Sequence, residues 1–507
     1  MPEYLSPGVY VEEIPSSVKP IQGVGTSTGA FVGFAEKGPI GEAILIGNRG
    51  EFFNQFGGFI PNADLAYAVN LFFENGGTRC YVVRTCAHSS TGRLAALSTF
   101  TFQDSATDDA LKVDAHSPGT WGDSLAISIE HPAAAPAFRL VVFYRGEQVE
   151  SYDSVDLEPN SDAFVELLVN DVSAYIRVHA NPDSIGTLPG RPVVDNRRSL
   201  PGGSNGIVTA SIADSDFTGL DGLQSFDPID DINIVGIPDS ASRSVMLLGI
   251  NYCENRRDCF FIAHATDTVD TAAEARDFKQ ATGSEYVGQN AFNSSYGALY
   301  VPWINVPDPL TNKSRLVSPV GAVAGRYSQT DIRRGVHKAP AGQEDGLLRG
   351  VLSLRKQLSH AELAVLNPIN VNVLRNITGV GNVIWGARTV SADPEFRYVG
   401  TRRLLLYIEE SIEEGTQWVV FEPNTPSLWR SIERNIRAFL RVVWRTGALF
   451  GETEDRAFYV KCDAETNPPD SIEEGKVITE IGVAITKPAE FVIFRISQSK
   501  AGAEISE

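Results

Sequence analysis

The sequence predicts a multidomain chain of mixed α/β and α+β class. It should hold a central parallel-type sheet covered by helices, a β-rich insertion domain, and extended strand arms at the N- and C-termini. Three observations predict this. The 507 residues exceed what one hydrophobic core usually supports. Residues 232–306 alternate apolar strands with helical stretches, which is typical of a parallel sheet. Residues 95–206 change to short strands separated by Asp, Pro and Gly.

The N-terminal segment, residues 1–22, predicts an extended arm. Its stretch SPGVYVEEIP carries β-branched residues and a tyrosine in near alternation between two prolines, which is typical of one short strand over 8–14. The next residues are rich in Ser, Pro, Thr and Gly, so they predict a tether and not a hairpin turn. The strand has no partner nearby in the sequence, and its backbone donors and acceptors must pair elsewhere.

Residues 23–94 and 207–388 are predicted to form the core. The first part reads as a compact α+β unit whose helix stops at a Gly-Gly pair. The second part alternates strand and helix, which predicts parallel strands. The predicted strands lie within 28–46 and at 78–86, 232–239, 259–266 and 297–306, and the predicted helices lie at 64–77, 242–255 and 271–281.

Residues 95–206 predict a β-rich, acidic insertion. Strands are expected at 125–131 and 138–146, and one helix at 162–172. From Ala95 to Gly236 the chain has seven Lys or Arg against 22 Asp or Glu, a balance of −15 out of the formal −20 of the whole chain. Such a concentration of charge indicates a solvated, separate module.

The last third predicts another α/β domain, residues 389–475, and a C-terminal arm, residues 476–507. The domain should hold a helix at 401–414, a strand at 416–422 and a long helix at 427–449. The arm begins with a strand-forming sequence that Lys487 and Pro488 interrupt.

The long helix carries two stripes. Apolar residues follow the spacing of one helical face. Five arginines occupy a second stripe, in steps of four, three, four and four, with only Glu433 as a nearby opposite charge within the helix. A solvated helix face normally mixes charges of both signs, so this arginine row predicts a surface for an acidic partner. The row consists of Arg430, Arg434, Arg437, Arg441 and Arg445.

Composition argues against several functional classes. The apolar share of 43% and the charged share of 21% are typical of folded globular chains. The formal charge of −20 argues against a nucleic-acid-binding surface. The five cysteines form no disulfide or zinc pattern, and we expect no metal and no cofactor. We expect neither a signal peptide nor a membrane span, because no basic and apolar leader and no run of about 18 apolar residues occurs.

No catalytic site is predicted, although two alternatives stay open. The pentapeptide GGSNG (202–206) has the spacing of a nucleophile elbow but follows a polar loop, and no Walker A motif occurs. One alternative is an α/β hydrolase-like enzyme that would use the carboxyl edge of the parallel sheet near Asp239 and His264. The other is a capsid-like structural protein, which would share the arms but form closed shells.

Five blocks of the sequence resemble contractile tail sheath proteins. They are the opening YLSPGVYVEEI, residues 317–342, residues 397–412, the arginine helix, and the ending EIGVAITKPAEFVIFRI. Proteins of this family occur in contractile-tailed phages, R-type pyocins and phage-tail-like contractile injection systems. The likeness covers both ends and most of the second half, in the right order, whereas the 95–206 insertion has no match.

The resemblance implies a structural, non-enzymatic subunit. Family members form hexameric rings that stack helically around an inner tube, and they contract by rigid-body rearrangement to drive the tube through a target envelope. The resemblance implies assembly in the cytoplasm of the producing cell, and then a place in a phage tail or in a released or anchored contractile particle. The implied partners are further copies of the chain, the inner tube protein, and baseplate and terminal cap proteins, with no nucleic acid and no direct membrane insertion.

The resemblance also implies roles for particular residues. The arms would insert as strands into the sheets of neighbouring subunits, and the arginine helix would meet the inner tube. The residues so assigned are Val9, Tyr10, Val11, Glu12, Ile14, Val477, Ile478, Ile481, Val483 and Ile485 for the arms, and Arg430, Arg434, Arg437, Arg441 and Arg445 for the tube contact.

Overall fold

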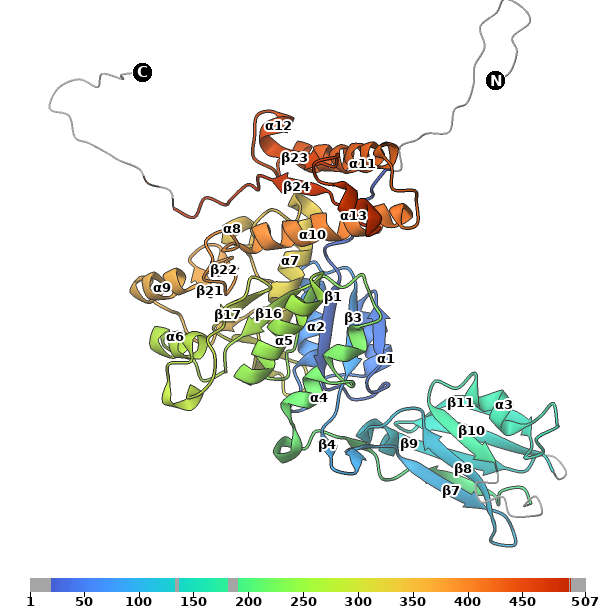
Figure 1. Ribbon diagram of the computed structural model, residues 1–507. Coiled ribbons are helices and arrows are strands. Elements are labelled where there is room, and N and C mark those ends of the chain that lie inside the picture. Colours follow the sequence, from blue (N-terminus) through green and yellow to red (C-terminus); the bar gives the residue numbers. More distant parts are fainter. Residues whose placement is uncertain (1–19, 133–135, 181–189, 492, 494–507) are drawn as a thin grey trace, which may run out of the picture. The chain divides into compact units, whose positions relative to one another are not determined.

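The computed structural model describes residues 20–491 and 493, except 133–135 and 181–189. The chain divides into two compact units (Figure 1). The larger unit comprises residues 23–336 and 340–411, and the smaller one comprises residues 337–339 and 412–507 together with the N-terminal 22. Within the described ranges, no helix is both long and apolar enough to cross a bilayer.

An eight-stranded mixed sheet forms the centre of the larger unit, in the order β2-β3-β1-β15-β16-β17-β21-β22. The six inner strands run parallel, and the two edge strands run antiparallel to their neighbours. The mixed α/β class predicted from the sequence is confirmed. The strands are β1 Gly29–Gly33, β2 Ala43–Ile46, β3 Cys80–Arg84, β15 Ile234–Gly236, β16 Phe260–His264, β17 Gly297–Val301, β21 Val371–Ile377 and β22 Gly381–Ile384.

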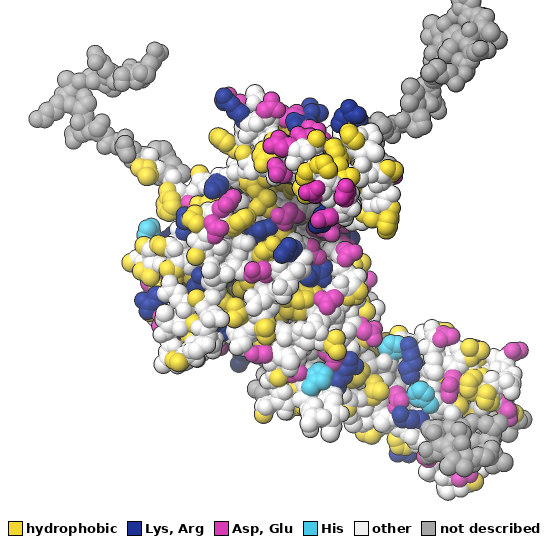
Figure 2. Space-filling view, viewed as in Figure 1, with side chains coloured by type: hydrophobic (Ala, Val, Ile, Leu, Met, Phe, Trp, Pro, Cys, Tyr) yellow, Lys and Arg dark blue, Asp and Glu magenta, His cyan; other side chains and the backbone are white. Residues whose placement is uncertain are grey.

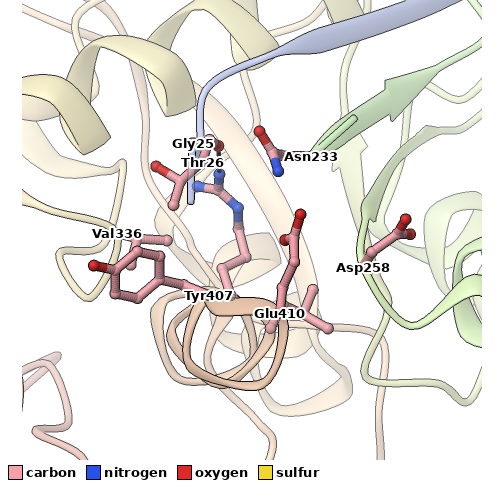
Figure 3. A pocket seen from close by; sticks show the side chains of 9 residues that line it. Gly25, Thr26, Asn233, Asp258, Val336, Tyr407 and Glu410 are labelled. Carbon is pink, nitrogen blue, oxygen red and sulfur yellow. Dashed lines mark hydrogen bonds between the residues drawn. The ribbon is translucent and has the colours of Figure 1, made fainter. Parts of the chain in front are cut away.

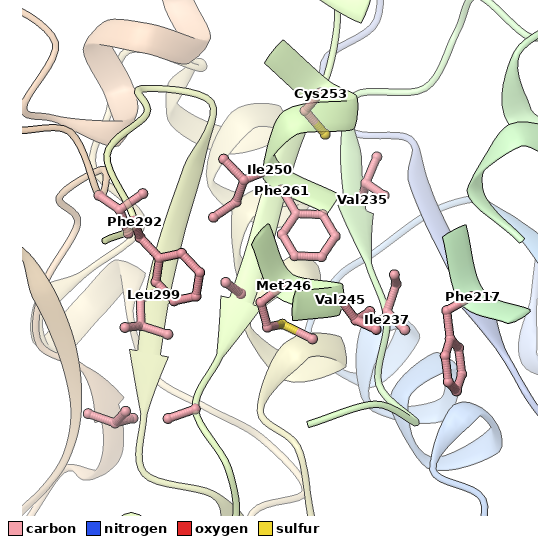
Figure 4. Close-up of a cluster of buried hydrophobic side chains, with 14 of the residues drawn as sticks. Phe217, Val235, Ile237, Val245, Met246, Ile250, Cys253, Phe261, Phe292 and Leu299 are labelled. Atoms are coloured by element: carbon pink, nitrogen blue, oxygen red, sulfur yellow. The ribbon is translucent and has the colours of Figure 1, made fainter. Parts of the chain in front are cut away.

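Helices cover this sheet, because its inner strands are apolar on both faces. Helix α5, Arg243–Arg256, places Val245, Met246 and Ile250 in one buried cluster with side chains of β15, β16 and β17 (Figure 4). Helices α2, Leu65–Glu74, and α7, Val320–Arg334, pack against each other and against β1. They approach so closely that a Cβ on Gly321 would lie 2.0 Å from the carbonyl oxygen of Ala68.

One predicted core element differs from the structure. The strand expected at 297–306 is two strands, β17 and β18 (Ile304–Asp308), because the chain turns at Pro302, which has no N–H to donate. Strand β18 joins a separate three-stranded sheet. The other elements of this unit are β19 Lys313–Val317, β20 Ser353–Leu354, α1 Arg49–Phe56, α4 Asp214–Thr218, α6 Ala272–Gln280, α8 Gly342–Asp345 and α9 His360–Leu366.

The acidic insertion folds as two sheets, β11-β10-β9-β13 and β12-β8-β7, which share one apolar core. At its root, β6 pairs with β14, so the segments that enter and leave the insertion lie side by side. A hairpin of β4 His88–Ser89 and β5 Gly92–Arg93 precedes the insertion. The elements of the insertion are β6 Ala95–Ala96, β7 Thr99–Gln103, β8 Asp109–Ala115, β9 Leu125–Glu130, β10 Phe138–Tyr144, β11 Glu147–Val155, α3 Val165–Asn170, β12 Ile176–Ala180, β13 Asp195–Ser199 and β14 Ser204–Asn205.

The smaller unit is built around helix α11, Pro426–Arg445, and a two-stranded antiparallel sheet of β23 and β24. The apolar stripe of α11 is buried, and α11 packs on β23. The strand predicted at 416–422 is wrong: a 3-10 turn is followed by Phe421, which is fully exposed with a φ of 69°. The elements are α10 Val399–Thr416, whose last residues belong to this unit, α12 Glu454–Ala457, β23 Phe458–Lys461, α13 Pro469–Glu473 and β24 Glu480–Val483.

Candidate assembly surfaces

The five arginines of α11 do not share one environment. Arg430, Arg434 and Arg445 are exposed, whereas Arg437 and Arg441 are partly buried. Among the residues that the structure describes, no acidic side chain lies within salt-bridge distance of Arg430 or Arg445. Both signs of charge surround α11 and α12 (Figure 2). Acidic side chains therefore neutralise only part of the positive charge of this row.

The compensating charge is Glu454, at the start of α12. Its Oε2 accepts from Nε of Arg441 at 2.7 Å, and its Oε1 accepts from Nη2 of Arg441 at 3.1 Å and from Nη1 of Arg437 at 3.4 Å. The hydrogen bond from Arg441 holds the pKa of Glu454 below its ordinary value. Sequence reasoning missed this contact because it counted charges within the helix only. The acidic pair Glu454–Asp455, just beyond the helix, was the available signal.

The β23–β24 sheet leaves one edge of β24 open. Within the described chain, β24 pairs with β23 only, from Phe458↔Val483 to Lys461↔Glu480. The N–H groups of Ala484 and Thr486 bond back to Ala457 and Ala448, at 2.8 and 3.1 Å. Since successive residues of a strand direct their backbone groups to opposite edges, the odd-numbered residues 481, 483 and 485 face away from the sheet's own strands.

The predicted arm residues have different positions. Val9, Tyr10, Val11, Glu12 and Ile14 lie outside the described residues. Ile481 and Val483 lie in β24 and Ile485 bridges to Leu449, whereas Val477 and Ile478 precede the strand. Ile478 is held by Asn467, through 2.6 and 3.0 Å hydrogen bonds between its backbone and that amide. We predicted that this C-terminal segment joins a sheet of a neighbouring subunit. In the structure, residues 480–483 pair with β23 of the same chain.

The segment that leads into β1 is held by α10 within the larger unit. Arg403 of α10 donates from Nη2 to the carbonyl oxygen of Thr26 at 2.7 Å, and Val24 donates its N–H to Oγ of Ser411 at 3.1 Å. A small pocket lies beside this contact, and Figure 3 shows Tyr407 of α10 beside Val336 and Glu410 projecting from the same helix. The residues that line this pocket include Thr26 and Arg403, the pair that forms the hydrogen bond described above.

The residues of the enzyme alternative have structural partners. His264 is buried, with Nδ1 3.0 Å from the carbonyl oxygen of Ala265, and burial lowers its pKa. Asp239 accepts from the N–H groups of Phe34, at 2.7 Å, and Asp64. Ser204 lies in β14 and accepts from Gly206, away from any strand-to-helix turn. No group of three metal-ligating side chains occurs in the described ranges.

Comparison with protein families gives two adjoining matches. A model of the phage tail sheath protein central domain matches residues 217–390, and a model of the phage tail sheath C-terminal domain matches residues 391–499. The chain belongs to the phage tail sheath protein family. The resemblance predicted from the sequence blocks is thereby confirmed.

Named tail sheath proteins are similar over part of their length. A putative prophage major tail sheath protein of Pseudomonas aeruginosa (strain UCBPP-PA14) is 27% identical over 206 residues, which is 40% of this chain and 52% of that protein. The tail sheath protein of Enterobacteria phage T4 is 21% identical over 276 residues, 54% of this chain and 40% of that protein. The chain thus matches about half, or less, of these sheath proteins.

Solved sheath structures share the fold over nearly the whole chain. The sheath of an extracellular contractile injection system, PVC, in its contracted state has a TM-score of 0.61 at 19% identity and covers 99% of both chains. A sheath tail protein of Desulfitobacterium hafniense has a TM-score of 0.61 at 12% identity, and covers 90% of this chain and 94% of that one. At these identities the likeness establishes the sheath fold alone.

Proposed function

We propose that this tail sheath protein polymerises as stacked hexameric rings around an inner tube, and that the rings contract to drive the tube through a target envelope. The observation that carries the proposal is the open edge of β24. A two-stranded sheet is marginally stable alone, and its unpaired backbone groups are a template for strands of another chain. The side chains of Ile481, Val483 and Ile485 at this edge are half-buried and apolar.

The arms provide the complementary strands. The strand predicted at 8–14 has no partner nearby in the sequence, and an arm from residue 6 to residue 21 would reach at most roughly 55 Å. Beyond Pro488, the largely apolar sequence EFVIFRI (490–496) is a second candidate strand, and its Phe491 and Ile493 are 73% and 78% exposed. In this proposal, residues 477–485 form the acceptor strand, and arms of other subunits extend its sheet.

The arginine face of α11 provides the tube contact. An electrostatic contact templates assembly on an acidic tube, and it can also be released, because exposed charges are solvated again without a large penalty. Arg430, Arg434 and Arg445 are exposed for this role. Contraction is then a switch between two packings of rigid subunits that stay linked through their strands.

Other partners and locations follow from the same proposal. The structural neighbours include sheath complexes and the baseplate of an anti-feeding prophage. We infer that this chain contacts baseplate and terminal cap proteins, that it assembles in the cytoplasm of the producing cell, and that it ends in a phage tail or a contractile particle. The acidic insertion would form the outer surface, where like charges keep particles apart.

Electron microscopy of the purified full chain tests the proposal. Long hollow cylinders with sixfold rings are the expected result. Closed shells would favour a capsid-like protein, and a monomer that does not polymerise, even on purified inner tubes, would contradict the sheath role. A chain lacking residues 1–20 should stay folded and soluble but fail to form contractile tubes.

A further inference from the structure

The carboxylate of Glu454 occupies the middle of the arginine face. It makes a two-point contact with Arg441, at 2.7 and 3.1 Å, and also reaches Arg437 at 3.4 Å. Arg437 further lies 3.6 Å from Glu433 and 3.9 Å from Asp455. Arg437 and Arg441 therefore meet neighbouring carboxylates, whereas Arg430, Arg434 and Arg445 are exposed.

The Glu454 contact is built to be exchanged. The side chain of Arg441 is 42% exposed and that of Glu454 is 23% exposed, so water can solvate both groups when they separate. Ion pairs of this exposure shift an equilibrium by about two- to fivefold at most. A partner that presents several carboxylates to the same helix can therefore displace Glu454 from Arg437 and Arg441.

Glu454 also lies next to the sheet that is expected to link subunits. It opens the four-residue helix α12, and Phe458, the first residue of β23, follows that helix directly. Strand β23 pairs with β24, whose outer edge is open in the described chain. Glu454 is thus separated from this sheet by one short helix.

We propose that Glu454 is an internal competitor for the acidic partner of α11. It holds Arg437 and Arg441 while the subunit is off the inner tube, gives them up when the tube's carboxylates bind, and takes them back on contraction. The inference rests on the proposed function, because it assumes that the arginine face binds the tube. The inference adds that Glu454 weakens the contact between the arginine face and the tube, and so makes release of the tube easier.

A charge-matched pair of variants tests the competitor role. Glu454→Gln keeps the shape and one acceptor oxygen but removes the charge, whereas Asp455→Asn makes the same change in net charge at a side chain that is 92% exposed. Full-length subunits are mixed with purified inner tubes, and the concentration for half-saturation is measured by co-sedimentation over a range of salt concentrations. Thermal unfolding checks that both variants fold.

The competitor role predicts that Glu454→Gln binds the tube about two- to fivefold more tightly than wild type, with a steeper loss of binding in salt. Asp455→Asn should change the half-saturation much less. Equal effects of the two variants, or no gain for Glu454→Gln, would overturn the competitor role. A third variant, Arg430→Glu/Arg445→Glu, separates the two proposals. If this variant binds the tube like wild type, both the tube contact of α11 and the competitor role are wrong. If it binds more weakly but Glu454→Gln shows no gain, the tube contact stands and only the competitor role is wrong.

Discussion

Arg403 and Asp331 form a buried, two-point ion pair between α10 and α7. Nη1 of Arg403 lies 2.9 Å from Oδ1 of Asp331, and Nη2 lies 2.6 Å from Oδ2. The two side chains are only 4% and 2% exposed. Because the same guanidinium also binds the carbonyl oxygen of Thr26, this pair fixes the segment that leads into β1.

Replacing Arg403 by Met should lower the free energy of unfolding by about 3 to 5 kcal/mol, because it leaves the Asp331 carboxylate buried without a counter-charge. Guanidinium denaturation of the full chain measures the loss. Arg355→Met is the control, since its partner Asp270 is 43% exposed, and it should cost less than about 1 kcal/mol. Equal losses in the two variants would contradict the anchoring role.

Asp239 and Asp64 should make stability depend on pH. Burial raises the pKa of Asp239 to about 8 and that of Asp64 to about 6. A carboxyl group whose pKa is raised by folding stabilises the folded chain. The contribution is complete when the pH is below the pKa of the unfolded chain, near 4, and it is lost as the pH rises toward 8. We expect the free energy of unfolding to fall from about pH 4 to pH 8, with Asp64 contributing up to about pH 6 and Asp239 up to about pH 8, and to fall less in Asp239→Asn. Parallel slopes for both chains, in denaturation at each pH, would refute this assignment.

His88 should stabilise the root of the insertion. Its ring nitrogens lie 2.9 Å from Oδ1 of Asp216 and 2.9 Å from Oδ2 of Asp221, so the ring bridges two carboxylates. His88→Gln should therefore destabilise the chain by about 1 to 3 kcal/mol, since Asp216 is almost fully buried.

Limited proteolysis would add a local readout for His88. Cleavage within residues 88–95 should be faster in His88→Gln than in wild type. His179→Gln, at an exposed histidine of the insertion, is the control and should leave the rate unchanged. If both variants are cleaved like wild type, the cluster does not hold the root.

The exposed arginines of α11 should decide binding to the inner tube. The variant Arg430→Glu/Arg434→Glu/Arg445→Glu reverses three charges without breaking the contacts of Glu454, so the subunit should keep its thermal stability. Its binding to purified tubes should fall at least about tenfold at physiological salt. Binding that equals wild type in co-sedimentation would show a solvated face instead of a partner surface.

Local patterns predicted most core elements. Helix α2 has helical periodicity and strands β15 and β16 are continuous apolar runs, and neighbouring residues specify both patterns. The error at 416–422 has the opposite cause: the residues favour a strand, but nothing in the described chain pairs with them, and Phe421 takes a positive φ.

The sequence predicted which residues form the candidate surfaces, but it did not predict which residues they contact. Five arginines in a row are visible in the sequence, whereas the contact of Arg441 with Glu454 joins residues 13 apart across a turn. The alternation in 477–485 indicates a strand, but it does not specify that β23 is the partner. Tertiary contacts determine both pairings, so they become visible only in the folded structure.

Cryo-electron microscopy of the assembled sheath, at a resolution that shows side chains, tests strand exchange most directly. We predict that a strand from another subunit lies along the edge formed by Ile481, Val483 and Ile485, and that it can be traced to residues 8–14 of that subunit's N-terminal arm. A map in which this edge faces solvent, or in which only segments of the same chain cover it, would contradict the account.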